Sequence, residues 1–219
     1  MKRHILITGA SRGLGRALAE RYLREGHRVT AVARSFAEPL EGAHHIEADV
    51  AEVDPARLLG EAVGALGPVD TLIHIASTLG PVPLVPLLDT EADELLRATQ
   101  VNLLAPFGLS RAAAGAMAVR QEGTIVYISS DAAVQPYATW GAYGASKAAG
   151  AHLHAIWAEE LAEHGVRIVT VDPGEMNTQM HSDAMPDADP NRLASPEDIA
   201  DRLFARWASS EAGRWELQS

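Results

Sequence analysis

The chain contains no cysteine among its 219 residues. This absence excludes disulfides, a thiolate nucleophile and a cysteine-ligated zinc site. No apolar run approaches the roughly 20 residues that a membrane-spanning helix needs. The three apolar residues at positions 5–7 are too few for the apolar region of a secretory signal. We therefore expect a cytoplasmic protein whose function involves neither a membrane nor a metal ion.

Basic side chains are scarce as well. Lysine and arginine together number 18 against 29 acidic residues, so the formal net charge is −11. A broad surface for nucleic-acid phosphates would lack its electrostatic driving force, and we exclude nucleic acid as a partner. Apolar residues make up 47% of the chain and charged residues 21%, which is ordinary for a folded protein. The length favours one domain over residues 1–219.

Short apolar runs alternate with longer helical patterns. Strands are expected at residues 5–8, 27–34, 44–50, 69–76, 123–130, 165–174 and, in "GRWELQS", 213–219; helices are expected at 15–25, 55–66, 91–119 and 140–164. The near-continuous apolar strands indicate a sheet that is covered on both faces. This order predicts a single-domain α/β Rossmann fold, with a doubly wound, mostly parallel seven-stranded sheet and helices on both faces. Two proline-containing segments, 78–90 and 175–196, follow strands and are expected to wall a ligand site.

A glycine-rich turn joins the first strand to the first helix. The stretch "TGASRGLG" places Gly9, Gly13 and Gly15 at this turn. Free backbone N–H groups and the positive end of a helix dipole would meet there and could bind a pyrophosphate. A tight turn with close packing of the helix on the sheet is the alternative interpretation.

Several motifs together resemble one family. The spacing TGxxxGxG resembles the cofactor motif of the short-chain dehydrogenase/reductase family, and "YGASK" at 143–147 resembles its YxxxK motif. Ser130, at the end of "IVYISS", stands where the family has its catalytic serine. Asn102 in "VNLLAP", Asp49 in "ADV" and "PGEMNT" at 173–178 are similar to three further family segments. The motifs occur in the family's order along almost the whole chain.

The resemblance implies a catalytic set of Ser130, Tyr143, Lys147 and Asn102. Tyr143 and Lys147 are four residues apart, so on a helix they share a face. A phenol titrates near pH ~10, and the Lys147 charge, together with the oxidised nicotinamide, would stabilise its phenolate. By resemblance, Tyr143 protonates the developing alkoxide, Ser130 bonds the same oxygen, Lys147 holds the nicotinamide ribose and Asn102 positions a water. Taken singly, each residue also has a structural interpretation as packing, a solvated neighbour or a cap.

The end of the second predicted strand bears on cofactor choice. Enzymes that prefer NAD usually place an acidic residue there, whereas this chain has Arg34. A guanidinium favours the 2′-phosphate of NADP, and Arg12 adds a second positive charge in the glycine turn. Solvated loop arginines are the alternative. The residues expected to bind NADP(H) are Gly9, Ser11, Arg12, Gly13, Leu14, Gly15, Arg34, Asp49, Val50, Ala76, Asn102, Tyr143, Lys147, Pro173, Gly174, Met176 and Thr178.

The chain departs from the family pattern at three places. Residues 74–77 read "HIAS" where the family commonly has Asn-Asn-Ala-Gly, so only Ala76 is retained. His74 must either bond to a neighbouring strand, as the asparagine would, or belong to an altered site. Asp172 replaces a frequent asparagine before "PG". The C-terminus is shorter than in many relatives, which argues against assemblies that interlock C-terminal tails.

The function implied is NADPH-dependent reduction of a ketone, aldehyde or diketone on a small, fairly apolar substrate. We expect the substrate pocket to be walled by residues 132–135, Tyr137, Trp140, Met176, Met180, His181 and Met185, where methionines suit a pliable lid or merely pack a short helix. An NAD-linked alcohol dehydrogenase of the same family and a non-catalytic dinucleotide-binding sensor are the alternatives. The alanine-rich predicted helices could pair with their symmetry mates to form a homodimer or homotetramer.

Overall fold

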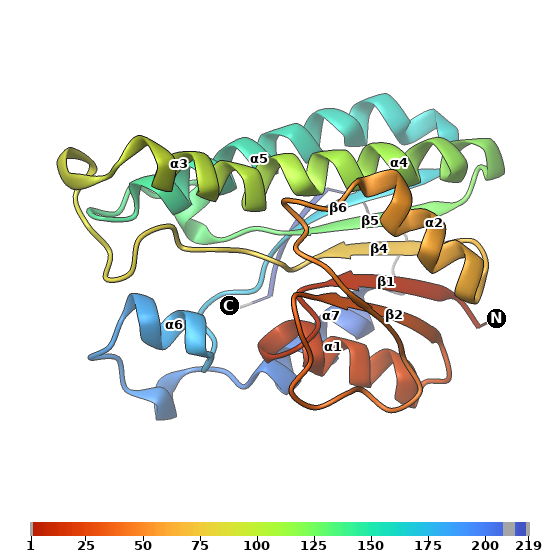
Figure 1. Ribbon diagram of the computed structural model, residues 1–219, viewed down its shortest axis with the longest axis horizontal. Coiled ribbons are helices and arrows are strands. Elements are labelled where there is room, and N and C mark those ends of the chain that lie inside the picture. The colour runs from red at the N-terminus through yellow and green to blue at the C-terminus, as the bar shows by residue number, and fades with distance from the viewer. Residues whose placement is uncertain (1, 208–212, 218–219) are drawn as a thin grey trace.

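The structure, a computed structural model, describes residues 2–207 and 213–217. Its strands form one sheet in the order β3-β2-β1-β4-β5-β6-β7 (Figure 1). All strand pairings are parallel, and the central strand β1 pairs with β2 on one side and β4 on the other. The strands are β1 His4–Thr8, β2 Arg28–Ala33, β3 His44–Glu47, β4 Thr71–His74, β5 Gly123–Ile128, β6 Val166–Asp172 and β7 Gly213–Glu216. The predicted single-domain Rossmann fold is confirmed, and the last two residues of the strand predicted at 213–219 lie outside the described residues.

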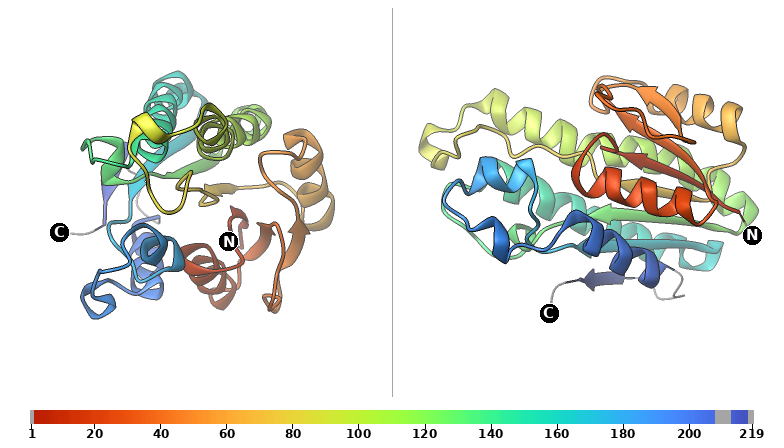
Figure 2. Two further views of the ribbon diagram at one scale, coloured as in Figure 1. Left: turned by 60° about the vertical axis from the view of Figure 1, so that its left-hand side comes forward. Right: turned by 90° about the horizontal axis from the view of Figure 1, so that it is seen from below.

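Helices cover both faces of this sheet (Figures 1 and 2). One face packs against α2 (Pro55–Leu66), α4 (Ala105–Arg120) and α5 (Gly141–Leu161), and the other against α1 (Gly13–Arg24) and α7 (Pro196–Trp207). The short helices α3 (Ala92–Thr99) and α6 (Gln179–Ala184) lie beyond the carboxyl ends of the strands, on the left of Figure 1. Single turns of 3-10 helix occur at Leu87–Asp89, Asp131–Ala133, Ala162–His164 and Pro190–Arg192.

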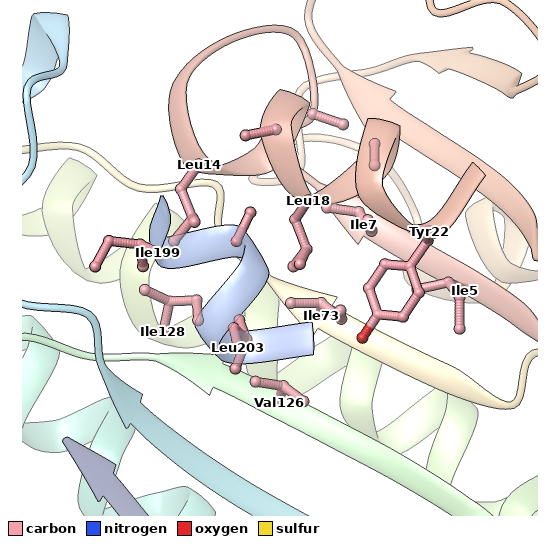
Figure 3. Close-up of a cluster of buried hydrophobic side chains, with 14 of the residues drawn as sticks. Ile5, Ile7, Leu14, Leu18, Tyr22, Ile73, Val126, Ile128, Ile199 and Leu203 are labelled. Carbon is pink, nitrogen blue, oxygen red and sulfur yellow. The ribbon is translucent and has the colours of Figure 1, made fainter. Parts of the chain in front are cut away.

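Apolar alternation along β1 supplies both cores. Ile5 and Ile7 pack beneath α1, whereas Leu6 between them packs against the core on the opposite face. This alternation follows from the two-residue period of a strand. Figure 3 shows Leu14, Leu18 and Tyr22 of α1, spaced four residues apart, pointing with side chains of α7 toward the sheet. The position of α1, and of the turn before it, is therefore set by a packed core.

The helix predicted over residues 91–119 is interrupted. A π-helical segment, Gln100–Leu104, separates α3 from α4. Pro106 explains the interruption, because it has no N–H with which to bond the carbonyl of Asn102, four residues earlier. The Tyr127 hydroxyl donates a hydrogen bond to this carbonyl instead, at 2.8 Å. The bulge thus places Asn102 against the end of the sheet.

The helices of the structure can be compared with the length and apolar content that a membrane-spanning helix needs. Within residues 2–207 and 213–217, none of the helices combines the length and apolar content that would let it span a bilayer.

Candidate active site

A cleft of about 1020 Å³ opens at the carboxyl ends of the strands. Gly9, Arg12, Gly13, Arg34 and Asp49 line one part of it, which we call the turn end. Ser130, Asp131, Tyr137 and Tyr143 line another part, which we call the tyrosine end. The segments after β4 and β6 contribute to its walls, as the sequence predicts.

The glycine turn has a backbone that side chains would strain. Gly9 and Gly13 have φ angles of 75° and 54°, in the left-handed region that favours glycine. A Cβ on Gly9 would also meet the backbone nitrogen of Ala76 at 2.7 Å. Gly15 serves a different purpose, because a Cβ there would overlap the carbonyl oxygen of Gly9. The turn therefore presents the N-terminus of α1 to the cleft while Gly15 permits close packing behind it.

Tyr143 and Lys147 lie on the same face of α5, and both are almost fully buried. The Lys147 Nζ donates a hydrogen bond to the Ile128 carbonyl at 2.8 Å. It lies 5.7 Å from the centroid of the Tyr143 ring and 5.1 Å from that of Tyr127, so two aromatic rings flank the ammonium group. These contacts fix the lysine beside the tyrosine.

Burial shifts the two titrating groups in opposite directions. It raises the pKa of Tyr143 to about 12, and the charges of Asp131 and Asp172 add to the rise while a hydrogen bond from Ser130 opposes it. Burial lowers the pKa of Lys147 to about 7. At neutral pH, Tyr143 is a protonated phenol beside an amine that gains or loses its proton near that pH. The expectation that the Lys147 charge stabilises the phenolate is therefore not met in this structure, because burial outweighs it and raises the pKa of Tyr143.

Ser130 follows β5 and caps the 3-10 turn after it. Its Oγ accepts a hydrogen bond from the Ala132 N–H at 3.2 Å and donates one to Asp131 Oδ1 at 2.9 Å. A side-chain hydrogen bond also links the Ser130 and Tyr143 hydroxyls and acts to lower the pKa of Tyr143. The serine predicted as catalytic therefore also has the capping role that was its structural alternative.

Asn102 is fully buried, and its side chain joins three segments. Its Oδ1 accepts hydrogen bonds from the Ser77 hydroxyl and the Thr78 N–H, both at 2.9 Å. Its Nδ2 donates to the Thr78 carbonyl at 2.8 Å and to Ser146 Oγ at 2.9 Å. The amide thus links the segment after β4 to α5, next to Lys147.

His74 belongs to a buried polar chain that crosses to the helices. Its Nε2 lies 2.7 Å from Ser110 Oγ on α4, which lies 3.4 Å from His154 Nε2 on α5. Burial holds the pKa of His74 well below its usual value and lowers the pKa of His154 to about 4, so both rings are neutral. The Nε2 atom therefore bonds a helix and not a neighbouring strand, and His74 is not among the residues that line the cleft. The structure matches neither of the two sequence alternatives, because the ring has a buried structural role.

The turn end carries exposed positive charge. Arg12 and Arg34 are both exposed and line the cleft. Burial raises the pKa of Asp49, but hydrogen bonds from Ala51 and Arg97 and the charge of Arg34 outweigh it, so the pKa is lowered. The Arg97 guanidinium lies 2.6 Å from Asp49 Oδ2.

The tyrosine end is lined by aromatic, acidic and methionine side chains. Of the expected wall residues, Tyr137, Trp140, Met176, Met180, His181 and Met185 line the cleft. Ala132, from the expected segment 132–135, packs instead with Leu79 and Tyr143 in a small buried cluster. The remaining lining residues predicted to bind a dinucleotide are Ser11, Leu14, Val50, Ala76, Pro173, Gly174 and Thr178.

Three side chains of the site are absent from the sequence predictions. Asp131 and Arg97 line the cleft, and Tyr127 bonds the Asn102 carbonyl beneath Lys147. Proline at position 106 could have indicated the free carbonyl four residues before it, and hence a donor such as Tyr127. The adjacency of Asp131 to Ser130 is visible in the sequence, but its contacts depend on the 3-10 turn.

Comparison with known proteins shows which family the chain belongs to. The sequence profile of the short chain dehydrogenase family matches residues 3–189. The chain belongs to the short-chain dehydrogenase family. It is 31% identical to the 2,3-dihydro-2,3-dihydroxybenzoate dehydrogenase of Bacillus subtilis, over 90% of this chain and 86% of that protein. It is 30% identical to the 3-oxoacyl-[acyl-carrier-protein] reductase MabA of Mycobacterium avium, over 82% of this chain and 69% of that protein.

A solved short-chain dehydrogenase extends the likeness to structure. The protein from Escherichia coli CFT073, complexed with NADPH, superposes with a TM-score of 0.90 at 27% identity, covering 99% of this chain and 97% of that one. The chain is therefore a member of an oxidoreductase family that uses nicotinamide dinucleotides.

Proposed function

We propose that this short-chain dehydrogenase is an NADPH-dependent reductase of ketone, aldehyde or diketone substrates. The observation that carries the proposal is the pairing at the tyrosine end: a neutral Tyr143 phenol, with its pKa raised to about 12, beside Ser130 and Lys147. A group that must give up a proton to a nascent alkoxide has to be protonated at working pH, and Tyr143 meets this requirement.

The cleft has the features that a dinucleotide needs. The positive φ angles of Gly9 and Gly13 keep side chains away from the N-terminus of α1, which suits a pyrophosphate. Ser11, Arg12 and Leu14 would flank the pyrophosphate, Asp49, Val50 and Ala76 the adenosine half, and residues 173–178 the nicotinamide half. Asn102 holds the segment that contains Ala76 and Thr78 in place through its amide. When bound, the dinucleotide supplies the hydride.

The proton chemistry belongs to the protein. As the carbonyl carbon receives the hydride, the Tyr143 hydroxyl donates its proton to the carbonyl oxygen, and Ser130 donates a hydrogen bond to the same oxygen. The phenolate left behind lies beside Lys147. The protonated ammonium form of Lys147 stabilises this phenolate and can return a proton to it. The result is an alcohol and an oxidised cofactor, with the phenol restored from solvent.

Two arginines support a preference for NADPH. Arg34 and Arg12 are exposed at the turn end, where a 2′-phosphate would accept charge-assisted hydrogen bonds. The competing assignment, an NAD-linked alcohol dehydrogenase, would use the same Tyr143 and Lys147 pair in the reverse direction, so the two arginines are what favours NADPH over it. The two relatives named above are a dehydrogenase and a reductase, so their names support either direction for the family.

The surface of α3, the π segment and α5 supports assembly. Leu95, Leu96 and Leu104 on α3 and the π segment, and Ile156 on α5, are 41–52% exposed. These apolar side chains favour pairing of copies of this chain as a homodimer or homotetramer, which light scattering would distinguish.

The experiment is a spectrophotometric screen of carbonyl compounds with NADPH and NADH, run on the wild type and Tyr143→Phe. We expect NADPH oxidation by the wild type and a loss of about 100-fold or more in Tyr143→Phe, with NADPH binding retained. Tyr22→Phe is the matched control, because the buried Tyr22 hydroxyl has no hydrogen-bond partner within the described residues. Equal activity of Tyr143→Phe would remove the proposed acid, and NADPH binding without turnover of any carbonyl would favour the sensor.

A further inference from the structure

Asp131 is hydrogen-bonded to the proposed catalytic serine and lines the same cleft. Its Oδ1 accepts hydrogen bonds from Ser130 Oγ at 2.9 Å and from the Ala132 N–H at 2.8 Å. Its Oδ2 accepts a hydrogen bond from the Tyr137 hydroxyl at 2.8 Å. The side chain is exposed and lines the cleft, so a substrate held at Ser130 would meet this carboxylate.

The Ser130 hydroxyl has a single hydrogen to donate. In the structure that hydrogen is directed to Asp131 Oδ1. For the reaction under "Proposed function", on which this inference rests, the same hydrogen must turn to the substrate's carbonyl oxygen. Asp131 then loses a donor. Water can replace it while the side chain is exposed, but a substrate that covers Asp131 displaces this water and must itself supply a donor.

A substrate can supply that replacement. A hydroxyl on the carbon next to the carbonyl would lie beside the oxygen that Ser130 and Tyr143 hold, and it can donate to Asp131 Oδ1. The group that it replaces is itself a hydroxyl, so the exchange conserves the number and kind of hydrogen bonds at Asp131. A ketone with a methyl group in that position offers no donor.

The charges around Asp131 also affect which group a substrate can carry on the carbon next to its carbonyl. The hydrogen bond to Asp131 and its charge raise the pKa of Tyr137, and the charges of Glu175 and Asp172 act in the same direction. Asp172 itself lies 3.2 Å from the Arg214 guanidinium on β7, which partly offsets its charge. Asp131, Asp172 and Glu175 all line the cleft, and Glu175 lies 3.7 Å from His181 Nε2. A carboxylate bound beside Asp131 would therefore be repelled.

We propose that Asp131 is a specificity-determining residue, which selects carbonyl substrates with a hydroxyl on the adjacent carbon and rejects those with a carboxylate in that position. The substrate class is therefore α-hydroxy ketones and aldehydes. Once such a substrate binds, Asp131 holds its hydroxyl and releases Ser130 to bond the carbonyl oxygen.

Three ketones on one phenyl scaffold test this proposal. They are 2-hydroxyacetophenone, propiophenone, in which a methyl group replaces the hydroxyl, and phenylglyoxylate, which bears the carboxylate. The value of kcat/KM with NADPH would be measured for each ketone with the wild type, Asp131→Asn and Asp187→Asn. Asp187 is exposed in the segment after α6, so the control removes the same charge away from Ser130.

We expect the wild type to prefer 2-hydroxyacetophenone over propiophenone by at least about tenfold, the effect of one charge-assisted hydrogen bond. It should disfavour phenylglyoxylate relative to propiophenone. Asp131→Asn should reduce both ratios to within about threefold of unity, whereas Asp187→Asn should keep the wild-type ratios. Titration of the NADPH-loaded Tyr143→Phe variant with the first two ketones should give the same order of Kd without turnover.

The outcomes separate this inference from the proposed function. Reduction of the ketones with equal preference, or the same ratios in Asp131→Asn as in the wild type, would overturn the role of Asp131 and leave the reductase intact. Efficient reduction of phenylglyoxylate would also overturn it. Absence of NADPH oxidation with all three ketones and with the wider carbonyl screen would contradict the proposed function and this inference together.

Discussion

The turn end and the tyrosine end of the cleft are built in different ways. The turn end relies on backbone: positive φ angles at Gly9 and Gly13, and the start of α1, which a packed core holds in place. The tyrosine end relies on side chains from two segments: Ser130, which follows β5, and Tyr143 and Lys147 on α5, arranged by hydrogen bonds and burial. Their charges also differ, since Arg12 and Arg34 line the first and Asp131 and Asp172 the second.

This difference separates the two tasks of the site. A positive turn end suits the phosphates of a dinucleotide, while burial at the tyrosine end, helped by the charges of Asp131 and Asp172, holds the phenol in its protonated form. Substitutions at one end should therefore change one task and spare the other.

Ser130→Ala should damage the tyrosine end alone. Loss of one hydrogen-bond donor to the reacting oxygen lowers turnover by about 100-fold or more, and we expect NADPH affinity to stay within about twofold of wild type. Steady-state kinetics and fluorescence titration measure the two quantities. The control is Ser129→Ala, because the buried Ser129 hydroxyl has no hydrogen-bond partner within the described residues. A parallel loss of NADPH affinity in Ser130→Ala would contradict the separation.

Arg34→Asp should damage the turn end alone. Removing charge-assisted hydrogen bonds to a 2′-phosphate, and adding repulsion, should raise the Kd for NADPH by about 10- to 100-fold. The Kd for NADH should change far less. Arg57→Asp, at an exposed position of α2, changes the net charge equally and should leave the NADPH/NADH ratio unaltered. An unchanged ratio in Arg34→Asp would refute the assignment.

Gly15→Ala should destabilise the fold at the turn end, because the new Cβ would overlap the Gly9 carbonyl. We expect a loss of about 1–3 kcal/mol in the free energy of unfolding, measured by urea denaturation. Gly60→Ala is the matched comparison within α2, where a Cβ meets no atom within 4 Å. That substitution should stabilise the protein by up to about 1 kcal/mol. If Gly15→Ala and Gly60→Ala changed the free energy of unfolding equally, the close approach of Gly15 to the Gly9 carbonyl would be contradicted.

Lys147→Met should change how stability depends on pH. Burial lowers the folded-state pKa of Lys147 to about 7 from 10.5, so between these values the unfolded chain binds the extra proton. Wild-type stability therefore gains a positive slope with pH over this window, at most about 1.4 kcal/mol per pH unit. Lys147→Met should lose this contribution, whereas Lys2→Met, at the chain's exposed other lysine, should keep it. Urea denaturation at pH 7.5 and 8.5 measures the difference, and parallel curves for wild type and Lys147→Met would contradict the pKa.

Much of the sheet was predictable because its strands are apolar runs. β1, β5 and β6 are buried almost throughout, and each was expected within one or two residues of its observed ends. The interruption at Gln100–Leu104 was missed, since its cause combines Pro106 with a hydroxyl from a distant strand. Helical periodicity alone does not report such a tertiary bond.

The candidate site also has features that the sequence predicts and features that it does not. The glycine turn and the pair Tyr143 and Lys147 depend on local spacing, and the sequence places them in one cleft as observed. The contacts of Asp131 with Ser130 and Tyr137, and of His74 with Ser110, join groups whose meeting depends on the folded chain. Sequence spacing carries no signal for such contacts.

The most direct test of the account follows the transferred hydrogen. The wild type would be incubated in ordinary water with the best ketone of the screen and NADPH carrying deuterium at C4 on the transferred face, and the alcohol analysed by mass spectrometry and NMR. We predict one deuterium on the carbinol carbon, with the hydroxyl proton drawn from Tyr143 and hence from water. An alcohol without deuterium, or no alcohol from any ketone despite tight NADPH binding, would contradict the central claim.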